Sequence, residues 1–170
     1  MPCHIVEGFR IDRGFQVLLT EYPEVKAALD LKALDLRSFA PGARVYRHGA
    51  SSVLSDPWRR PIEGLSTAFS GPGTLVDRFR LATFRSAAAL ASEEDGGDAP
   101  RKSFEQALRE HGFSEDFIDG FMRPWFGGIT LDRSLSTDAS YCRFVFRCLA
   151  HGDAAVARAQ FTDNLPCSTR

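Results

Sequence analysis

The segment STDASYCRFVFRCLAHG, residues 136–152, decides the fold class of this chain. Its apolar side chains recur at i, i+3, i+4, i+7 and i+8, at Tyr141, Phe144, Val145, Cys148 and Leu149. This spacing puts side chains on one face of an α-helix. We therefore expect an amphipathic helix that begins near Ser136 or Thr137 and stops at Gly152, because glycine commonly ends helices.

A second long helix is predicted after Thr74. Thr74 and Asp77 have the spacing of a capping box, in which each residue satisfies a backbone N–H at the helix start. The helix turns Leu75, Phe79 and Ala82 to one side and Asp77 largely to another. The Leu75 side is thus the apolar face of this helix.

Two shorter helices are predicted between these long ones. Ser103 and Gln106 have capping-box spacing, and Gly112 ends the first of these helices. Ser114 has the side chain of an N-cap for the second. The stretch 123–133, RPWFGGITLDR, is rich in glycine and aromatic residues, and we expect a connection there rather than a helix.

The N-terminal third favours strands. Residues 6–12 are predicted to form a short strand that Gly14 ends, and residues 43–46 and 51–54 a β-hairpin around a turn at 48–49. The expected fold is therefore α+β and mainly helical, with a short strand, a hairpin near 43–55 and helices between 61 and 151.

Composition excludes several classes of protein. The chain has 170 residues, a net charge of −1 and 44% hydrophobic residues, which is ordinary for a soluble globular domain. Clustered Lys and Arg are lacking, so we expect no nucleic-acid partner. We also expect no transmembrane segment, no secretory signal and a cytoplasmic location, because neither an 18-residue apolar run nor a basic start followed by an apolar stretch is present.

Residue patterns alone identify no catalytic residue. The sequence has no C-x-x-C pair, no G-x-S-x-G and no G-x-G-x-x-G. The run nearest to a phosphate-binding glycine motif is SGPG at 70–73, which we interpret as a turn between a short helix at 62–69 and the next helix. Cys142 and Cys148 are expected to be buried thiols. No metal site is expected, because none of the four histidines has a second ligand three or four residues away on a helix. We expect them to be surface or capping residues: His4, His48, His111 and His151.

A resemblance carries the interpretation further. Residues 8–17, GFRIDRGFQV, are similar to a segment of the flavin amine oxidase and phytoene desaturase superfamily of FAD-dependent oxidoreductases, with the pattern G-[FY]-x-[FIL]-[DE]-x-G. Further runs resemble one bacterial and plastid subgroup in the expected order, over residues 6–156. They are TEYPE at 20–24, LDLRSF at 34–39, RPWFGGITLDR at 123–133, FVFR at 144–147 and GDAA at 152–155.

The resemblance implies FAD as cofactor and a small organic, apolar molecule as the substrate from which the flavin takes a hydride. The residues expected nearest the flavin are Asp12, Gly14, Phe15 and Gln16. Those expected to line the substrate cavity are Trp125, Phe126, Gly127 and Gly128; alternatively, the two aromatic residues pack in the core. The implied domains are a remnant of an FAD-binding domain at 1–17, a substrate domain at 18–156 and an unmatched, disordered tail at 157–170.

The chain departs from the family in one important respect. The G-x-G-x-x-G unit and the Gly-Gly-Arg turn that precede this segment in the family are absent from the sequence. We therefore expect an internal fragment, with FAD binding weak or absent, no activity in isolation and exposed apolar patches. The alternative interpretation is a helical interaction module that binds an apolar ligand or partner without redox chemistry.

Overall fold

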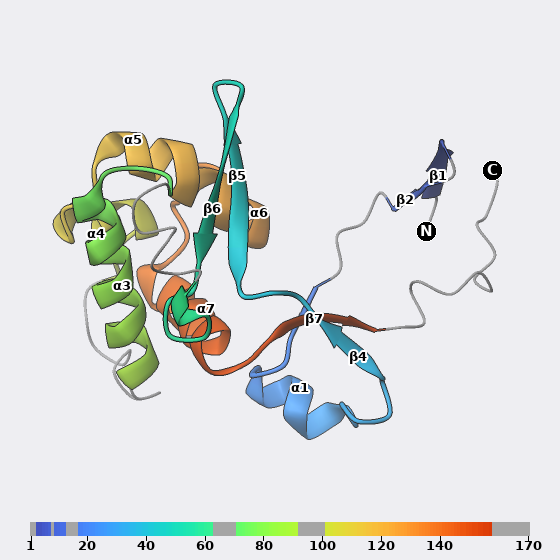
Figure 1. Ribbon diagram of the computed structural model, residues 1–170. Coiled ribbons are helices and arrows are strands. Elements are labelled where there is room, and N and C mark those ends of the chain that lie inside the picture. Colours follow the sequence, from blue (N-terminus) through green and yellow to red (C-terminus); the bar gives the residue numbers. More distant parts are fainter. Residues whose placement is uncertain (1–2, 8, 13–16, 63–70, 92–100, 158–170) are drawn as a thin grey trace. The chain divides into compact units, whose positions relative to one another are not determined.

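The computed structural model describes residues 3–7, 9–12, 17–62, 71–91 and 101–157 (Figure 1). The chain forms two compact units, and the second is an insertion into the first in sequence. Unit 1 comprises Met1–Phe39 and Gly152–Arg170, and unit 2 comprises Ala40–His151. The predicted domain boundary between residues 17 and 18 does not coincide with this division.

Unit 1 contains two small antiparallel sheets and one short helix. Strands β1 (Cys3–Val6) and β2 (Phe9–Asp12) pair with each other. In the other sheet, β7 (Ala154–Ala157) lies between β3 (Leu18–Leu19) and β4 (Leu36–Ser38). Helix α1 (Pro23–Ala28) joins β3 to β4 and begins with proline, whose fixed φ suits the first turn of a helix.

Two predictions for unit 1 need correction. The single strand predicted at 6–12 is wrong, because Glu7 has φ 52° and turns the chain between β1 and β2. Ala157, which we assigned to the disordered tail, pairs with Leu36 as the last residue of β7. The rest of that tail, 158–170, lies outside the described residues, as does most of the helix predicted at 62–69.

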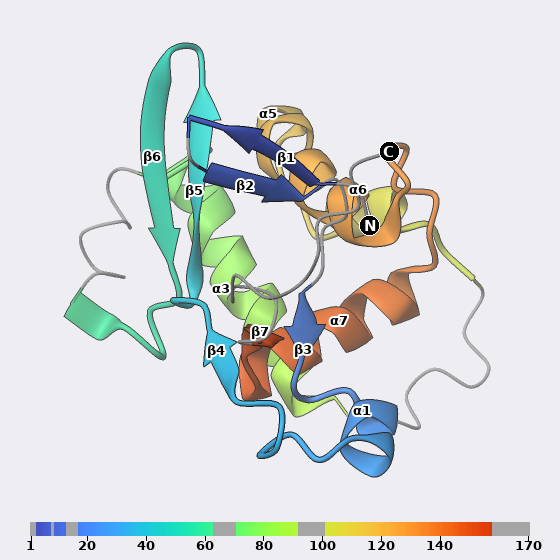
Figure 2. The ribbon, with the colours of Figure 1, turned by 90° about the vertical axis from the view of Figure 1, so that its right-hand side faces the viewer.

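Unit 2 begins with the hairpin of β5 (Gly42–Arg47) and β6 (Ala50–Ser55), which Figures 1 and 2 show as a long two-stranded arm. Its two-residue turn has φ 50° at His48 and 78° at Gly49, the left-handed values that such tight turns require. The predicted hairpin is thus confirmed.

Helices make up the rest of the described part of unit 2. They are α3 (Leu75–Leu90), α4 (Phe104–Glu110), α5 (Glu115–Phe117), the π-helix η2 (Ile118–Met122), α6 (Arg123–Thr130) and α7 (Ala139–His151). Thr74 and Ser103 complete capping boxes, and Ser114 caps α5, as predicted. The α+β, mainly helical fold class is confirmed.

The core of unit 2 is aromatic. Phe104 and Phe126 are fully buried with ring centroids 4.7 Å apart, and the Phe126 ring stacks on that of Phe146 at 4.8 Å. Phe84 of α3 meets Phe146 of α7 edge-on at 5.0 Å. Such pairs each add about 0.5–1.5 kcal/mol beyond the burial of their area. These contacts fix α3, α4, α6 and α7 against one another.

Three helix predictions were wrong in ways that matter for function. Residues 123–130 form helix α6 instead of a connection. In α3, Phe79 of the predicted apolar face is 71% exposed, whereas Asp77, which the sequence put largely on another side, is fully buried. In α7, Val145 and Cys148 are buried as expected, but Tyr141 is 42% exposed, and the neighbouring Cys142 and Phe146 are buried.

Candidate functional site

The residues predicted to lie nearest the flavin are only partly described. Asp12 is the last residue of β2, and its backbone is in register with Cys3 of β1. Gly14, Phe15 and Gln16 lie outside the described residues. Strand β2 thus ends two residues before Gly14 in the sequence.

The predicted substrate residues all lie on α6, but their environments differ. Trp125 is partly exposed, and its ring packs against those of Phe126 at 5.0 Å, Phe121 at 5.2 Å and Phe146 at 5.4 Å. Phe126 is fully buried between Phe104 and Phe146. Phe126 is thus a core residue, as the alternative interpretation proposed, whereas Trp125 presents part of its ring to the surface.

The two glycines of α6 also differ. A Cβ atom at Gly127 would lie 3.2 Å from the Cα atom of Arg133, so glycine here permits close packing of the loop that follows α6. A Cβ atom at Gly128 would meet nothing within 4 Å. Trp125 and Gly128 lie three residues apart on one side of α6 and are the accessible pair among the four predicted residues.

A π-helix leads directly into this segment. In η2 the backbone N–H of Arg123 bonds to the carbonyl oxygen of Ile118, five residues back. Single-turn π-helices within α-helices are frequent at functional sites, because the extra residue re-aims the side chains that follow. Here the re-aimed stretch carries Phe121 and Trp125, whose rings contact each other.

Arg47 of β5 reaches the outer side of η2. Its guanidinium binds the Asp116 carboxylate through two bonds of 2.6 and 2.7 Å. A Cβ atom at Gly120 would come within 2.6 Å of the guanidinium, so glycine at this position leaves room for the pair. The hydrogen bond from Arg47 lowers the pKa of Asp116. This contact fixes the hairpin arm against α5 and η2.

The loop after α6 is organised by Asp132. Its carboxylate accepts hydrogen bonds from Ser134, from Ser136 at 2.9 Å, and from the backbone and hydroxyl of Thr137 at 2.8 and 3.0 Å. These bonds, led by that of the Ser134 hydroxyl, hold the pKa of Asp132 far below its ordinary value. Because this loop packs on Gly127, Asp132 helps to fix the end of α6.

Charged groups around α6 pair with one another. Arg123 donates to Glu105 at 2.6 Å and to Asp119 at 2.9 Å, and its other nitrogen reaches the backbone oxygen of Arg133. These bonds hold the start of α6 against α4, η2 and the loop after α6.

Asp77 is a buried carboxylate that the sequence did not lead us to expect. Its oxygens accept from the backbone and hydroxyl of Thr74 at 3.0 and 2.6 Å, and from those of Ser114, both at 2.8 Å. Burial by itself raises the pKa of Asp77, but these hydrogen bonds outweigh it and hold the pKa below its ordinary value. One carboxylate thus joins the starts of α3 and α5.

The two buried cysteines of α7 are poor candidates for nucleophilic catalysis. Cys142 and Cys148 are buried, as predicted, and burial raises the pKa of the Cys142 thiol to about 12. A thiol so protonated at neutral pH is a weak nucleophile. Burial, helped by Arg80 and Arg143, lowers the pKa of His111.

The described part of the chain offers neither a metal-binding cluster nor a membrane-spanning helix. No group of three or more His, Cys, Asp or Glu residues in it is placed to hold a metal ion. None of the helices described there is both long and apolar enough to cross a membrane.

Comparison with known proteins gave no match: no family model, no curated protein and no solved structure was found to be similar to this chain.

Proposed function

We propose that this chain is part of an FAD-dependent oxidoreductase of the flavin amine oxidase and phytoene desaturase type, and that unit 2 binds a small organic, apolar substrate. The observation that carries the proposal is the ordered run of family-like segments from residue 6 to residue 156. Short patterns arise by chance one at a time, whereas several in the family's order do so far less often.

The connectivity of the chain supports this proposal. Strands β4 and β7 pair antiparallel, with Ser38 opposite Ala155, and all of unit 2 lies between them in the sequence. A helical unit inserted between two paired strands leaves their sheet intact. This is a suitable way to add a substrate-binding domain to a cofactor-binding one.

The described residues of this chain do not by themselves fit FAD. A dinucleotide pyrophosphate is normally held by a glycine turn at a helix N-terminus, and the sequence lacks G-x-G-x-x-G. On this proposal, polypeptide outside these 170 residues anchors the flavin, which supplies the hydride-accepting chemistry when bound. The role of this chain is then to present Trp125 and Gly128 to the substrate.

The second candidate function is an interaction module without redox chemistry. It is favoured by the outward face of α3, which is apolar. The two functions would use different helices, because the interaction module would bind through α3 and the enzyme would present Trp125 and Gly128 of α6.

Sequencing the native transcript upstream of the codon for Met1 separates the two functions. The flavoenzyme proposal predicts an uninterrupted open frame that encodes G-x-G-x-x-G and a Gly-Gly-Arg turn ahead of Ile5. A ribosome-binding site directly before Met1, with a stop codon in frame upstream of it, would contradict the flavoenzyme and favour the interaction module.

A further inference from the structure

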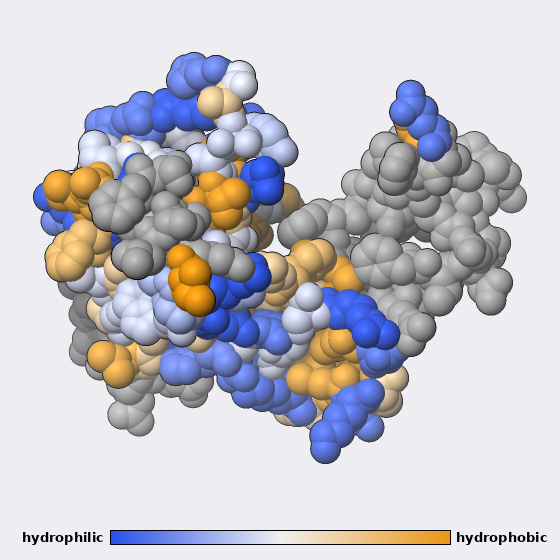
Figure 3. All heavy atoms as spheres, viewed as in Figure 1, coloured by the Kyte–Doolittle hydropathy of each residue, from blue (hydrophilic) through white to orange (hydrophobic). Residues whose placement is uncertain are grey.

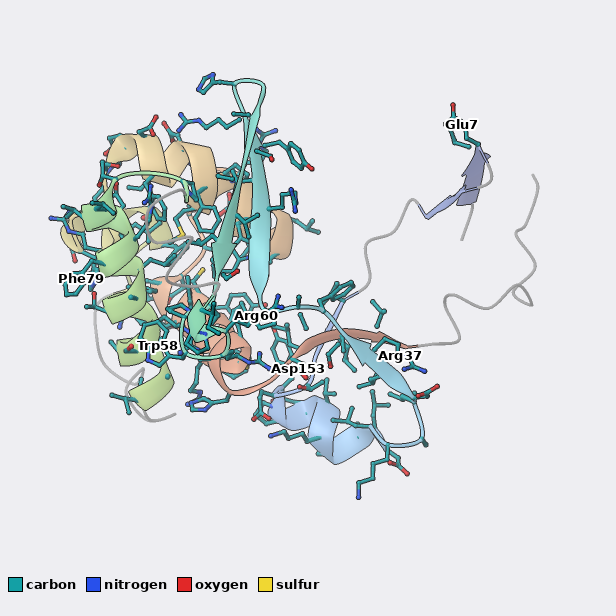
Figure 4. All side chains as sticks on the ribbon, in the orientation of Figure 1. Glu7, Arg37, Trp58, Arg60, Phe79 and Asp153 are labelled. Carbon is teal, nitrogen blue, oxygen red and sulfur yellow. The ribbon has the colours of Figure 1, made fainter. Side chains whose placement is uncertain are left out.

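Helix α3 presents its most apolar face to solvent. Leu75, Val76 and Phe79 are 59%, 54% and 71% exposed, and Leu90, three turns further on, is 87% exposed. Figure 3 shows hydrophobic surface along this helix, and Figure 4 shows Phe79 directed away from the neighbouring helices. We call the outward positions the α3 face. They are Leu75, Val76, Phe79, Thr83, Ala87 and Leu90.

The structure describes every residue of α3, and the α3 face carries no charged side chain. The three arginines of the helix are instead engaged with the rest of unit 2. Arg78 donates to the carbonyl oxygens of residues 71–73, and Arg80 to that of Gly112. Arg85 binds Asp56 at 2.6 Å and lies over the ring of Trp58.

This arrangement is unusual for a helix at a water-facing surface. Such helices normally turn their charged residues outward and their apolar residues inward. In α3 the arginines and Asp77 have partners on or beneath the helix, and the outward positions are apolar or Thr. Several large apolar side chains exposed on one helix face are typical of an interaction surface.

The spacing along the α3 face is symmetric. Five of its positions, 76, 79, 83, 87 and 90, are separated by 3, 4, 4 and 3 residues. If a second α3 lies antiparallel with a two-fold axis at Thr83, then Phe79 meets Ala87 of the other copy and Val76 meets Leu90. Each large side chain would thus face a smaller one, which is the complementarity that close helix packing needs.

We propose that the α3 face is a homodimer interface, in which α3 pairs antiparallel with α3 of a second copy of this chain about a two-fold axis at Thr83. A second copy suits the α3 face because the face is uncharged and therefore does not repel itself. A single helix pair lies at the small end of interface sizes, below about 1,200 Å², so the dimer should be reversible.

Sedimentation velocity over the micromolar concentration range tests for the dimer. The wild-type chain, of 18.8 kDa, is expected to shift from monomer to dimer as its concentration rises. Phe79→Glu should abolish the shift, because it places two charges in the apolar seam. The matched control is Tyr46→Glu, since Tyr46 is 76% exposed on the hairpin arm and should leave dimerisation unchanged.

Cross-linking tests the position of the axis. In a Cys3→Ser, Cys167→Ser background, Thr83→Cys should form an intermolecular disulfide under mild oxidation, because a residue on a two-fold axis meets itself. Helix axes about 8–10 Å apart bring seam Cα atoms within the roughly 4.4–6.8 Å that a disulfide spans. Tyr46→Cys is the control and should remain a monomer.

Three results would overturn the homodimer. They are a monomer at every concentration, a dimer that Phe79→Glu does not weaken, and Phe79-dependent binding of the monomer to phospholipid vesicles in place of self-association. None of these experiments requires flavin, so their outcome is independent of the proposed enzymatic function.

Discussion

Replacing Asp77 by alanine is expected to destabilise the folded chain by about 3–4 kcal/mol, because the change leaves two part-buried backbone N–H groups without their acceptor and removes the carboxylate that holds the N-cap residues of two helices. The four donors belong to Thr74 and Ser114, which are separated by forty residues in sequence. Urea unfolding followed by circular dichroism measures the loss.

Two further variants make the Asp77 result specific. Asp77→Asn keeps the shape but turns an amide NH₂ toward the donors, so we expect a loss of about 2 kcal/mol. Asp119→Ala removes an exposed carboxylate paired with Arg123 and should cost no more than about 0.5 kcal/mol. An Asp77→Ala chain as stable as the Asp119→Ala chain would show that Asp77 does not hold the two helix starts together.

Asp77 also gives the stability a predictable dependence on pH. Its pKa is lowered in the folded chain, so its stabilising effect is complete above the unfolded-state pKa of about 3.9. The effect is lost as the pH falls through the lower folded-state pKa. The difference in free energy of unfolding between wild type and Asp77→Asn should therefore shrink on acidification, and a constant difference would contradict this role.

Gly73→Ala is expected to destabilise the chain by about 2–4 kcal/mol, for two reasons that add. Gly73 has φ 70°, which an alanine adopts only with strain. The added Cβ atom would also overlap the ring of Phe117, a residue only 1% exposed, and would lie 3.2 Å from the Asp77 carboxylate. Thermal unfolding provides the measurement.

Two other glycines separate these causes. Gly49 has φ 78° but nothing within 4 Å of a built Cβ atom, so Gly49→Ala should show the backbone strain alone, about 1 kcal/mol. Gly128 is helical and equally open, and Gly128→Ala should be neutral or slightly stabilising. If Gly73→Ala costs no more than Gly49→Ala, the packing of Phe117 on the loop is looser than the structure indicates.

Local signals in the sequence predicted the parts of the fold that depend on near neighbours. The caps at Thr74, Ser103 and Ser114 and the hairpin turn at His48 were all predicted correctly, because each depends on residues at most a few positions apart. Strand β7 was missed. Its partners, β3 and β4, lie more than one hundred residues earlier in the chain, and four residues carry no recognisable period.

The orientation of α3 was not predictable from its own sequence. Its pattern offers an apolar face at Leu75 and Phe79 and a second one at Phe84 and Ala88, and only the latter is buried. The choice depends on Asp77, whose burial becomes acceptable only once Ser114 supplies its hydrogen bonds. Asp77 was recognised as a capping residue, but its link to a second helix required the tertiary structure.

The sequence indicated which segment carries the candidate site, but only the structure shows which of its residues are accessible. Glycine, proline and aromatic residues lower helix propensity, so residues 123–130 were expected to form a connection. Packing of Phe126 between two core rings overrides that propensity and makes the segment helical. Which of Trp125 and Phe126 is accessible follows from the rotation of α6, which η2 sets.

The flavin content of the longer gene product tests the central claim most directly. If an upstream frame is found, the polypeptide that it encodes together with residues 1–170 should retain flavin through gel filtration, with its visible absorbance, while the 170-residue chain alone should not. Gly14→Val in the longer product should lose the flavin, because a side chain there would hold the backbone away from the ring. A folded, colourless longer product, or flavin retained equally by Gly14→Val, would contradict the account.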